Sequence, residues 1–460
     1  DVPPRLILLG VIFSLSGAPL SIHQTRCSMV FSSLIFLFFF LPAVLLCYYI
    51  VPQRHLAVRN GVLLAFSLFF YFYGEPRLIV LLLVSIFVNF IFGLLMRSPH
   101  RKIWLTLCVI FNIAMLGVCK YLNFFISAAN SLFGTSLPLT GIVMPIGISF
   151  YTFQALSYVI DVYRHEAWPQ KNPFSLALYV SMFPQLIAGP IVRYVDIEEQ
   201  LEHRSMNVTK FGQGAMYFIR GLAKKVILAN TTGAVFEQIA AMHLGSYSVM
   251  TAWIGCISYA FQIYFDFGGY SDMAIGLGKM FGFEFLENFH YPYVSTSVTE
   301  FWRRWHMSLS GWFRDYVYIP LGGNRVSVLC HLRNIVIVWC LTGIWHGATW
   351  NFPVWGLYYA VILIGEKYVW KNLVSRLPGW AANTYTMLLV MFGWLIFMNT
   401  SWDAAAGMFA SLLGFGASSL IDVTAGYYLK TGILLFALCV LAARPVLKKL
   451  SERFIERYTI

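Results

Sequence analysis

One histidine of this chain stands where an ionisable side chain is costly. His346, in the segment CLTGIWHGATW, comes about eleven residues into an apolar run that begins near Ile335. Ionisable side chains in such surroundings are functional candidates by default, and burial favours the neutral imidazole that a general base needs. Gly343 and Gly347 flank it and would let a substrate or a neighbouring helix approach closely. The alternative is a structural histidine bonded to a backbone carbonyl.

A second histidine lies in a segment that crowds cations and indoles together. Residues 299–325 read TEFWRRWHMSLSGWFRDYVYIPLGGNR. We expect one helix from Thr299 to about Trp312, with His306 four residues after Trp302 on the same face. A metal shared by the two histidines would lack a third ligand at local spacing. Ser310 completes the face of His306, and the neighbouring face would carry Trp305, Leu309 and Phe313.

The arginines of this segment have two interpretations. Glu300 stands four residues before Arg304, so an ion pair is expected between them. This ion pair leaves two other arginines of the segment to be explained, Arg303 and Arg314. They are either anchors at the lipid headgroups or groups that steer an anionic ligand, such as the phosphates of a nucleotide-bearing cofactor. The residue types alone leave both interpretations open.

The composition places these residues in a membrane protein. Of 460 residues, 59% are hydrophobic and only 11% are charged, too few for the surface of a soluble domain. Strand-like alternation is absent, so we expect an all-α polytopic protein. Several apolar stretches are shorter than the roughly 20 residues of an upright span, which indicates tilted or broken helices. The stretches lie at about 30–51, 61–73, 78–96, 103–119, 139–160, 249–265, 333–345, 352–365, 384–398 and 428–442.

The formal charge of +12 comes largely from short basic tracts between the apolar stretches. Such tracts are typical of cytoplasmic loops, and this placement argues against a nucleic-acid-binding role. We therefore expect residues 52–59, residues 97–102 and the tail after Arg444 on the cytoplasmic side of the membrane.

No hydrophilic block is long enough to form a separate soluble domain. Residues 6–20 resemble the core of a signal peptide and Met29 can serve as a start, so we interpret residues 1–28 as a leader or an added extension. Residues 29–460 would then form a single membrane domain. Its catalytic centre, at about 144–371, mixes Pro, Gly and ionisable residues into apolar runs. In lipid, such broken helices persist where they line a cavity or tunnel.

Two further polar features have structural interpretations. The basic tract at 210–230 has amphipathic spacing and is expected to lie in the interface plane, with Arg220, Lys224 and Lys225 beside its apolar positions. Asp266 and Asp272 flank a Gly-Gly pair, where Asp272 would cap the helix that follows. The eight cysteines show no CxxC spacing and are interpreted as small hydrophobic residues.

Five stretches of the chain resemble the membrane-bound O-acyltransferases, and within them the bacterial alginate O-acetyltransferase branch. They lie in the part from Met29 to about Lys371 and read PIGISFYTFQ, FPQLIAGPI, YFDFGGYSDMAIGLGKMFGFEFLENF, FWRRWHMSLSGWFRDYVYIPLGGNR and RNIVIVWCLTGIWHGATWNFPVWGLYY. The resemblance implies a ring of roughly ten or more tilted and broken helices around a tunnel. It also implies an enzyme that moves an acyl group from a cytosolic thioester to an extracytoplasmic hydroxyl.

In that family the histidine of the WHG motif is catalytic, which corresponds to His346, and His306 occupies the second signature position. We interpret His346 as the base that deprotonates the acceptor hydroxyl, and His306 as a residue that orients a reactant or stabilises the oxyanion. Tyr359 stands where many relatives have a histidine, and no role is assigned to it. The donor and acceptor tunnel is expected to involve Trp302, Arg303, Arg304, Trp305, Arg314, Asp315 and Asn351.

The resemblance implies substrates and partners instead of a resident cofactor. We expect no bound metal, acetyl-CoA or another acyl thioester as the donor, and an extracytoplasmic polysaccharide such as alginate, or a relay acetyltransferase, as the acceptor. The expected location is the bacterial plasma membrane. Within the family, D-alanyl transfer to teichoic acid from a carrier protein is the alternative. Outside it, the alternative is a secondary transporter, although the chain shows no inverted repeat.

Overall fold

The computed structural model describes residues 29–187, 189–243 and 247–446, and the regular secondary structure of the described part is all helical, with no strand. The predicted all-α polytopic fold class is confirmed. The predicted leader, residues 1–28, lies outside the described residues. The described chain divides into two compact units. The N-terminal unit comprises residues 29–222 with 270–287, and the C-terminal unit comprises residues 223–269 with 288–446.

The helix of the N-terminal unit with the most buried residues is α7 (Ile148–Arg164). Helix α7 packs against α4 and α5, and α3 packs against α8. Two buried amides, Asn89 and Asn112, bond to each other between α4 and α5 at 2.8 Å, so this polar pair is satisfied inside the unit. The other helices are α2 (Leu41–Ile50), α3 (Leu56–Gly74), α4 (Ile79–Leu95), α5 (Arg101–Leu116), α6 (Leu122–Phe133), α8 (Pro173–Ser181), α9 (Phe183–Leu186), α10 (Tyr194–Glu202) and α11 (Val208–Ala223).

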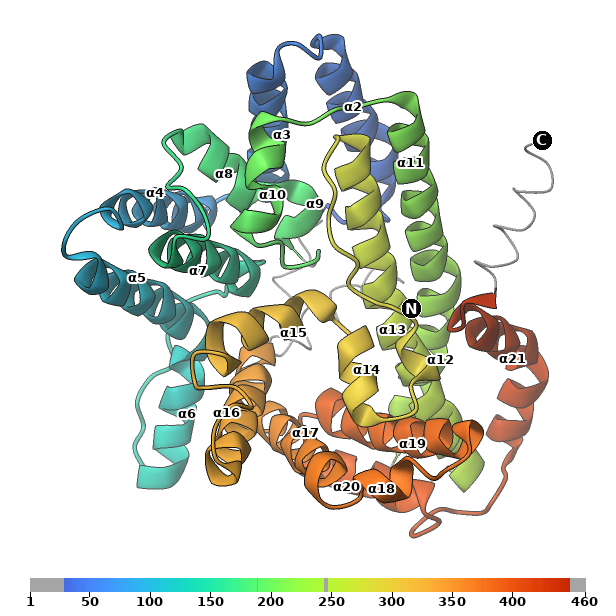
Figure 1. Cartoon of the computed structure of the whole chain (residues 1–460). Helices are drawn as coiled ribbons and strands as arrows, with labels where there is room; N and C mark the ends of the chain where they lie inside the picture. Colours follow the sequence, from blue (N-terminus) through green and yellow to red (C-terminus); the bar gives the residue numbers. More distant parts are fainter. Residues whose placement is uncertain (1–28, 188, 244–246, 447–460) are drawn as a thin grey trace. The chain divides into compact units, whose positions relative to one another are not determined.

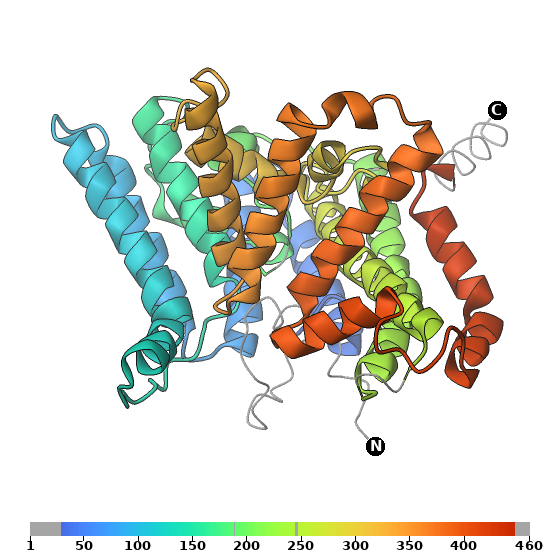
Figure 2. The same ribbon diagram turned by 90° about the horizontal axis from the view of Figure 1, so that it is seen from below.

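The C-terminal unit holds both candidate histidines. Its two best-packed helices are α16 (Val328–His346) and α17 (Asn351–Tyr368), which lie side by side in both views (Figures 1 and 2). The remaining helices are α12 (Asn230–Ala240), the part of α13 (Val249–Met280) up to residue 269, α14 (Val298–Arg304), α15 (Met307–Phe313), α18 (Lys371–Val374), α19 (Gly379–Met398), α20 (Trp402–Leu412) and α21 (Val423–Ala442).

Glycines make the close packing of α16 on α17 possible. A Cβ atom on Gly343 would come within 2.3 Å of the carbonyl oxygen of Phe352, and one on Gly356 within 2.2 Å of the carbonyl oxygen of Trp339. Small residues at a helix interface let two backbones approach in this way. The predicted close approach at Gly343 is therefore confirmed, and the group that approaches is the neighbouring helix.

Among the described residues, five helices are long and apolar enough to cross a membrane. Short π-helical turns occur within or at the ends of several helical runs. The ten predicted apolar stretches fall largely on helices; the main exceptions are residues 30–33 and residues 139–147, which precede α7 without regular structure. The five candidate spans are Leu56–Gly74, Arg101–Phe133, Val328–His346, Gly379–Met398 and Val423–Ala442. The π-helical turns are Phe36–Phe40, Gly117–Tyr121, Lys224–Ala229 and Arg314–Tyr318.

The two ends of the helices in the C-terminal unit differ in charge. Arg325, Lys371 and Arg376 stand in or beside the connections at the end where α16 begins and α17 finishes. The connections at the opposite end, residues 347–350 and 399–422, contain acidic residues but no Lys or Arg. We call these the basic end and the acidic end. The excess of cations predicts that the basic end faces the cytoplasm.

Two predictions about polar residues are wrong. Helix α13 continues through the Gly-Gly pair at 268–269, so Asp272 lies inside a helix and caps none. Packing along the helix overrides the weak helix propensity of the two glycines. Lys225 is not on an interfacial surface: it is buried and forms an ion pair with Asp266, Nζ to Oδ1 2.5 Å. A buried carboxylate on α13 thus decides which way this lysine points.

Candidate active site

His346 is the last residue of α16 and is half-buried among aromatic rings. Its imidazole lies 5.0 Å from the ring of Trp355 and 5.2 Å from that of Phe397, centroid to centroid, and meets both edge-on. Gly347 follows in extended conformation and ends the helix, and a Cβ there would collide with the ring of Phe352 at 2.0 Å. The imidazole is therefore set into an apolar wall but is still accessible.

His306 lies in a break between two short helices, and the prediction of one helix from Thr299 to about Trp312 is wrong. Helix α14 ends at Arg304 and α15 begins at Met307. His306 between them has a left-handed backbone, φ 44° and ψ 54°, which is uncommon for a residue other than glycine. The face that would have joined Trp302, His306 and Ser310 at regular helical spacing is not formed.

Asn288 is the physical reason for this break. Its side-chain oxygen accepts hydrogen bonds from the backbone N–H of Ser308 at 3.1 Å and from the hydroxyl of Ser308 at 2.9 Å. Its backbone carbonyl accepts from the N–H of Met307 at 2.9 Å. These bonds occupy the N–H groups at the start of α15, so the chain can begin a new helix there. Asn288 is fully buried and was not identified from the sequence.

The same amide oxygen assigns the protonated nitrogen of His306. A backbone N–H can only donate, so the Asn288 atom that faces Ser308 must be oxygen. The Nδ1 atom of His306 lies 3.1 Å from this oxygen and must therefore carry the proton. Burial lowers the pKa of His306 to about 3, so the ring is neutral at physiological pH. Its Nε2 atom keeps a free lone pair and has no hydrogen-bond partner among the described residues.

A single indole connects the two histidines. The ring of Trp345 lies 5.0 Å from that of His346 and 6.2 Å from that of His306. On its other side His306 meets the edge of Phe267 from α13, at 4.7 Å. The structure therefore brings both predicted histidines into one aromatic cluster, although one ends α16 and the other lies between α14 and α15.

A layer of tryptophans continues from His346 toward the basic end. Trp302 contacts Trp339 at 4.7 Å and Trp355 at 5.6 Å, and Trp355 contacts His346. The indole N–H groups of Trp302 and Trp355 are buried and have no acceptor among the described residues. Buried donors without partners are rare and deserve a functional explanation. Trp305 instead packs between Phe289 and Trp394, at 5.0 and 4.9 Å.

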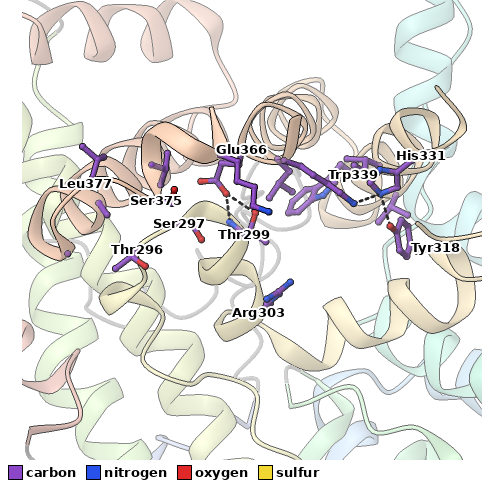
Figure 3. Close-up of a pocket in the computed structure, with 18 residues that line it drawn as sticks. Thr296, Ser297, Thr299, Arg303, Tyr318, His331, Trp339, Glu366, Ser375 and Leu377 are labelled. Atoms are coloured by element: carbon purple, nitrogen blue, oxygen red, sulfur yellow. Dashed lines mark hydrogen bonds between the residues drawn. The ribbon is translucent and has the colours of Figure 1, made fainter. Parts of the chain in front are cut away.

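A cavity of about 680 Å³ borders this layer at Trp339 and extends to the basic end, where Lys371 lines it. Figure 3 shows the side chains around it. Trp339 forms part of its wall, and Arg303 extends toward it from α14. Lys367 and Lys371 from the end of α17 and from α18 add two more cations. The volume is within the usual range for small-molecule sites, about 300–1,000 Å³.

The three predicted arginines have different environments. Arg303 is exposed and lines the cavity. Arg304 forms the expected ion pair with Glu300, at 2.8 Å, so that prediction is confirmed. Arg314 pairs with its neighbour Asp315, Nε to Oδ1 2.7 Å. Since Arg304 and Arg314 hold carboxylates, Arg303 is the arginine of this segment with a place on the cavity wall.

Two lining residues of the cavity were missed in the sequence. Glu366 reaches from α17 to the start of α14, where its carboxylate accepts from the N–H groups of Val298 at 2.7 Å and Thr299 at 2.9 Å (Figure 3). His331, for which the sequence indicated no role, is buried between the hydroxyls of Tyr318 and Tyr368, at 2.8 and 2.6 Å. A lone acid in the apolar run of α17 was the one available signal for Glu366.

Asn351, which was expected along the tunnel, holds two helices together. Its amide nitrogen donates to the carbonyl oxygens of Ile396 at 3.2 Å and Phe397 at 3.0 Å. These bonds fix the beginning of α17 to the end of α19, and so hold Phe397 against His346. Among the residues that the structure describes, no three His, Cys, Asp or Glu side chains gather to hold a metal ion.

Comparison with known families decides the class of this protein. The model of the MBOAT, membrane-bound O-acyltransferase family, matches residues 170–402. The chain belongs to this family. It is thus an O-acyltransferase and a multi-pass membrane protein.

Curated relatives of this acyltransferase agree with that assignment. The chain is 41% identical over 404 residues to the probable alginate O-acetylase AlgI of Azotobacter vinelandii, which covers 86% of this chain and 80% of the relative. It is 34% identical over 433 residues to the peptidoglycan O-acetyltransferase of Helicobacter pylori, with 86% and 82% covered. The teichoic acid D-alanyltransferase of Bacillus subtilis is 29% identical over 294 residues, with 56% and 70% covered.

Proposed function

We propose that this enzyme transfers an acetyl or other acyl group from a cytoplasmic thioester to a hydroxyl on the opposite side of a bacterial plasma membrane. The observation that carries the proposal is the position of His346. Its imidazole is half-buried in an aromatic wall, and a layer of indoles separates it from a cavity with three cations. In this proposal His346 is the base, and the cavity on the other side of the indole layer receives the anionic donor.

The donor is proposed to enter the cavity at the basic end. Arg303, Lys367 and Lys371 supply positive charge there, and both coenzyme A and the prosthetic arm of an acyl carrier protein carry phosphate. The cation bias of the connections supports a cytoplasmic position for this opening. The donor is a substrate that leaves after each turnover, so no resident cofactor is proposed.

The reaction needs a base because an alcohol is a weak nucleophile while its proton remains in place. His346 accepts the proton of the acceptor hydroxyl as the oxygen attacks the thioester carbonyl carbon. The tetrahedral intermediate then collapses, the carbon–sulfur bond breaks, and the departing thiolate takes the proton from the imidazolium. General-base catalysis of this kind is worth about 10²–10⁴-fold in rate.

Of the two roles considered for His306, its hydrogen bonds support the orientation of a reactant. Stabilising an oxyanion requires an N–H donor, but the proton of this neutral ring is on Nδ1 and is committed to Asn288. The Nε2 lone pair can accept a hydrogen bond from a hydroxyl. The buried indole N–H groups of Trp302 and Trp355 are better candidates for oxyanion donors, because each lacks an acceptor among the described residues.

The acceptor is proposed to be an extracytoplasmic polysaccharide, reached directly or through a relay acetyltransferase. The relatives at 41% identity carry the name alginate O-acetylase, which favours alginate or a similar exopolysaccharide. The relatives named teichoic acid D-alanyltransferase are less similar, at 28% and 29% identity, and match 48% and 56% of this chain. Acetyl transfer is therefore the first reaction to test.

The test is acetyl transfer by the purified protein in vesicles supplied with radiolabelled acetyl-CoA outside and alginate oligosaccharides inside. The proposal predicts label on the oligosaccharide, and His346→Ala should lower the rate by about 10²–10⁴-fold without changing the melting temperature. His100→Ala, at an exposed histidine in the connection before α5, is the matched control and should keep the wild-type rate. A His346→Ala enzyme that retains most of its turnover would refute the base assignment.

A second arm separates the possible donors. Replacing acetyl-CoA with an acetylated carrier protein should give little transfer if coenzyme A is the donor. Transfer only from the carrier protein would contradict the coenzyme A assignment while leaving the role of His346 intact.

A further inference from the structure

An apolar crevice separate from the acyl-transfer site lies between α13, α19 and α21. Its volume is about 470 Å³, within the range of ligand sites, about 300–1,000 Å³. The walls are almost entirely hydrocarbon, aromatic and thioether groups. Residues that represent the three helices are Trp253, Ala260, Met387, Met391, Phe436 and Val440.

The polar atoms of the aromatic residues in its wall are already bonded within the protein. The indole N–H of Trp253 donates to the carbonyl oxygen of Leu412 at 3.1 Å, and the hydroxyl of Tyr293 donates to the carbonyl oxygen of Ala260. The lining also includes one charged group, the guanidinium of Arg444, which follows the end of α21. It is exposed, and no carboxylate among the described residues pairs with it. The crevice therefore offers an apolar slot with one cation at its rim.

The attachment of α21 explains why a slot is left there. At its first turn, Asp422 accepts from the N–H of Ser248 at 3.0 Å and from the hydroxyl of Thr251 at 2.7 Å. Tyr428, one turn further, bonds to Gln238. From there to Arg444, α21 packs on the unit through apolar residues, among them Phe436, Cys439 and Ala443. Most of the side chains of this candidate span are exposed, so much of the helix faces the surroundings of the unit.

The cation lies toward the end of the unit that is predicted to face the cytoplasm. The backbone N–H of Val249 bonds to the carbonyl oxygen of Ser419, so α13 and α21 start together at the acidic end. Helix α21 runs from there toward the basic end, where Arg444 follows its last turn. Cations at the cytoplasmic side attract anionic lipid headgroups, at about 1 kcal/mol for each Lys or Arg.

We propose that this crevice binds one anionic phospholipid, with an acyl chain in the slot and the phosphate against Arg444. Leu429 and Val440 line the slot and are each 44% exposed, so it opens on the surface of a spanning helix where lipid is the abundant apolar occupant. Burying hydrocarbon against the thioether and aromatic walls fills space that water would occupy unfavourably. The site is independent of the proposed acyl transfer, because its lining contains neither histidine of that site.

The experiment is native mass spectrometry of the full-length protein after equilibration with vesicles of phosphatidylglycerol or of phosphatidylcholine. The wild type should retain one phosphatidylglycerol after mild delipidation. Arg444→Gln should reduce this occupancy by about fivefold, whereas Lys430→Gln, which removes an exposed cation from the same helix, should not. Both positions are exposed, so both variants are expected to fold.

A second pair of variants tests the slot itself. Val440→Trp adds bulk to the lining and should reduce lipid retention, while Leu441→Trp on the neighbouring exposed position, which does not line the slot, should leave it unchanged. Equal losses in the variants and their controls would overturn the proposal in favour of nonspecific lipid. Equal retention of phosphatidylcholine, unaffected by Arg444→Gln, would overturn it by removing the headgroup contact. Higher lipid occupancy after truncation at Val446 would overturn it in favour of the chain's own tail.

Discussion

His346 and His306 belong to one aromatic cluster but are held in opposite ways. His346 is surrounded by rings and half-buried, with aromatic contacts to Trp355 and Phe397. His306 is fully buried, and its Nδ1 donates a hydrogen bond to the side-chain oxygen of Asn288. The same oxygen accepts hydrogen bonds from the backbone N–H and the hydroxyl of Ser308. The difference indicates that the group proposed to exchange protons is kept accessible, and that the groups beside it are fixed by directional bonds.

The same contrast extends across the C-terminal unit. The Lys225–Asp266 pair and the Glu366 carboxylate are also buried and bonded, as His306 is. If buried, bonded groups and the accessible His346 have these different roles, substitutions at the buried groups should mainly lower the stability of the fold. Substitutions at His346 should mainly lower the rate of acyl transfer. Each prediction below tests whether a fixed group behaves in this way.

The largest stability effect is expected at the buried ion pair. Asp266→Asn leaves the ammonium of Lys225 buried without its counter-charge, and breaking such a pair typically costs about 3–5 kcal/mol. The double variant Lys225→Met/Asp266→Leu removes both charges and should recover most of the loss. Thermal unfolding in detergent, followed by tryptophan fluorescence, measures both. The structural role of the ion pair is refuted if Asp266→Asn stops acetyl transfer while its melting temperature stays at the wild-type value.

The apolar pattern of the sequence predicted most of this architecture. Helices α3, α4, α16, α17, α19 and α21 lie where the hydrophobic stretches placed them, because a bilayer leaves an apolar run little choice but a helix. The break at His306 could not be read in the same way. The residues around it include no proline or adjacent glycine, and the break depends on Asn288, 18 residues earlier.

Burial of the charged residues was hidden from the sequence for a related reason. Lys225 stands next to Lys224 in an amphipathic pattern, which is typical of a surface helix. Its partner Asp266 is on another helix, and only tertiary packing brings the two together. The local pattern identifies which residues carry charge, whereas long-range contacts decide which of them are buried.

The second effect is a pH dependence of stability that comes from His306. The folded state holds its pKa at about 3, below the ordinary value of 6.5, because burial disfavours the charged ring. As the pH falls below 6.5, the unfolded chain takes up a proton first, so the folded state loses about 1.4 kcal/mol per pH unit from this group. At pH 5 the loss is about 2 kcal/mol. His306→Gln cannot titrate and should show a shallower decline between pH 7 and pH 5.

Melting temperatures of the two proteins across this range measure the difference. His100→Gln, at an exposed position, serves as the control and should follow the wild type. Parallel curves for the wild type and His306→Gln would mean that the ring is solvated or already charged, and the contrast with His346 would lose its physical basis.

The smallest loss of stability is expected at Glu366, whose carboxylate accepts hydrogen bonds from the beginning of α14. Both oxygens accept bonds from the first turn of that helix, and a negative charge there is favoured by the helix dipole. Glu366→Gln keeps the shape but loses the charge and one acceptor, so it should cost about 1 kcal/mol. Glu202→Gln, at an exposed glutamate at the end of α10, should cost less. Because α14 carries Arg303, the Glu366 variant should also raise the KM for the thioester more than it lowers kcat. A loss confined to kcat would place Glu366 in the chemistry and would make it, like His346, a reactive group instead of a fixed one.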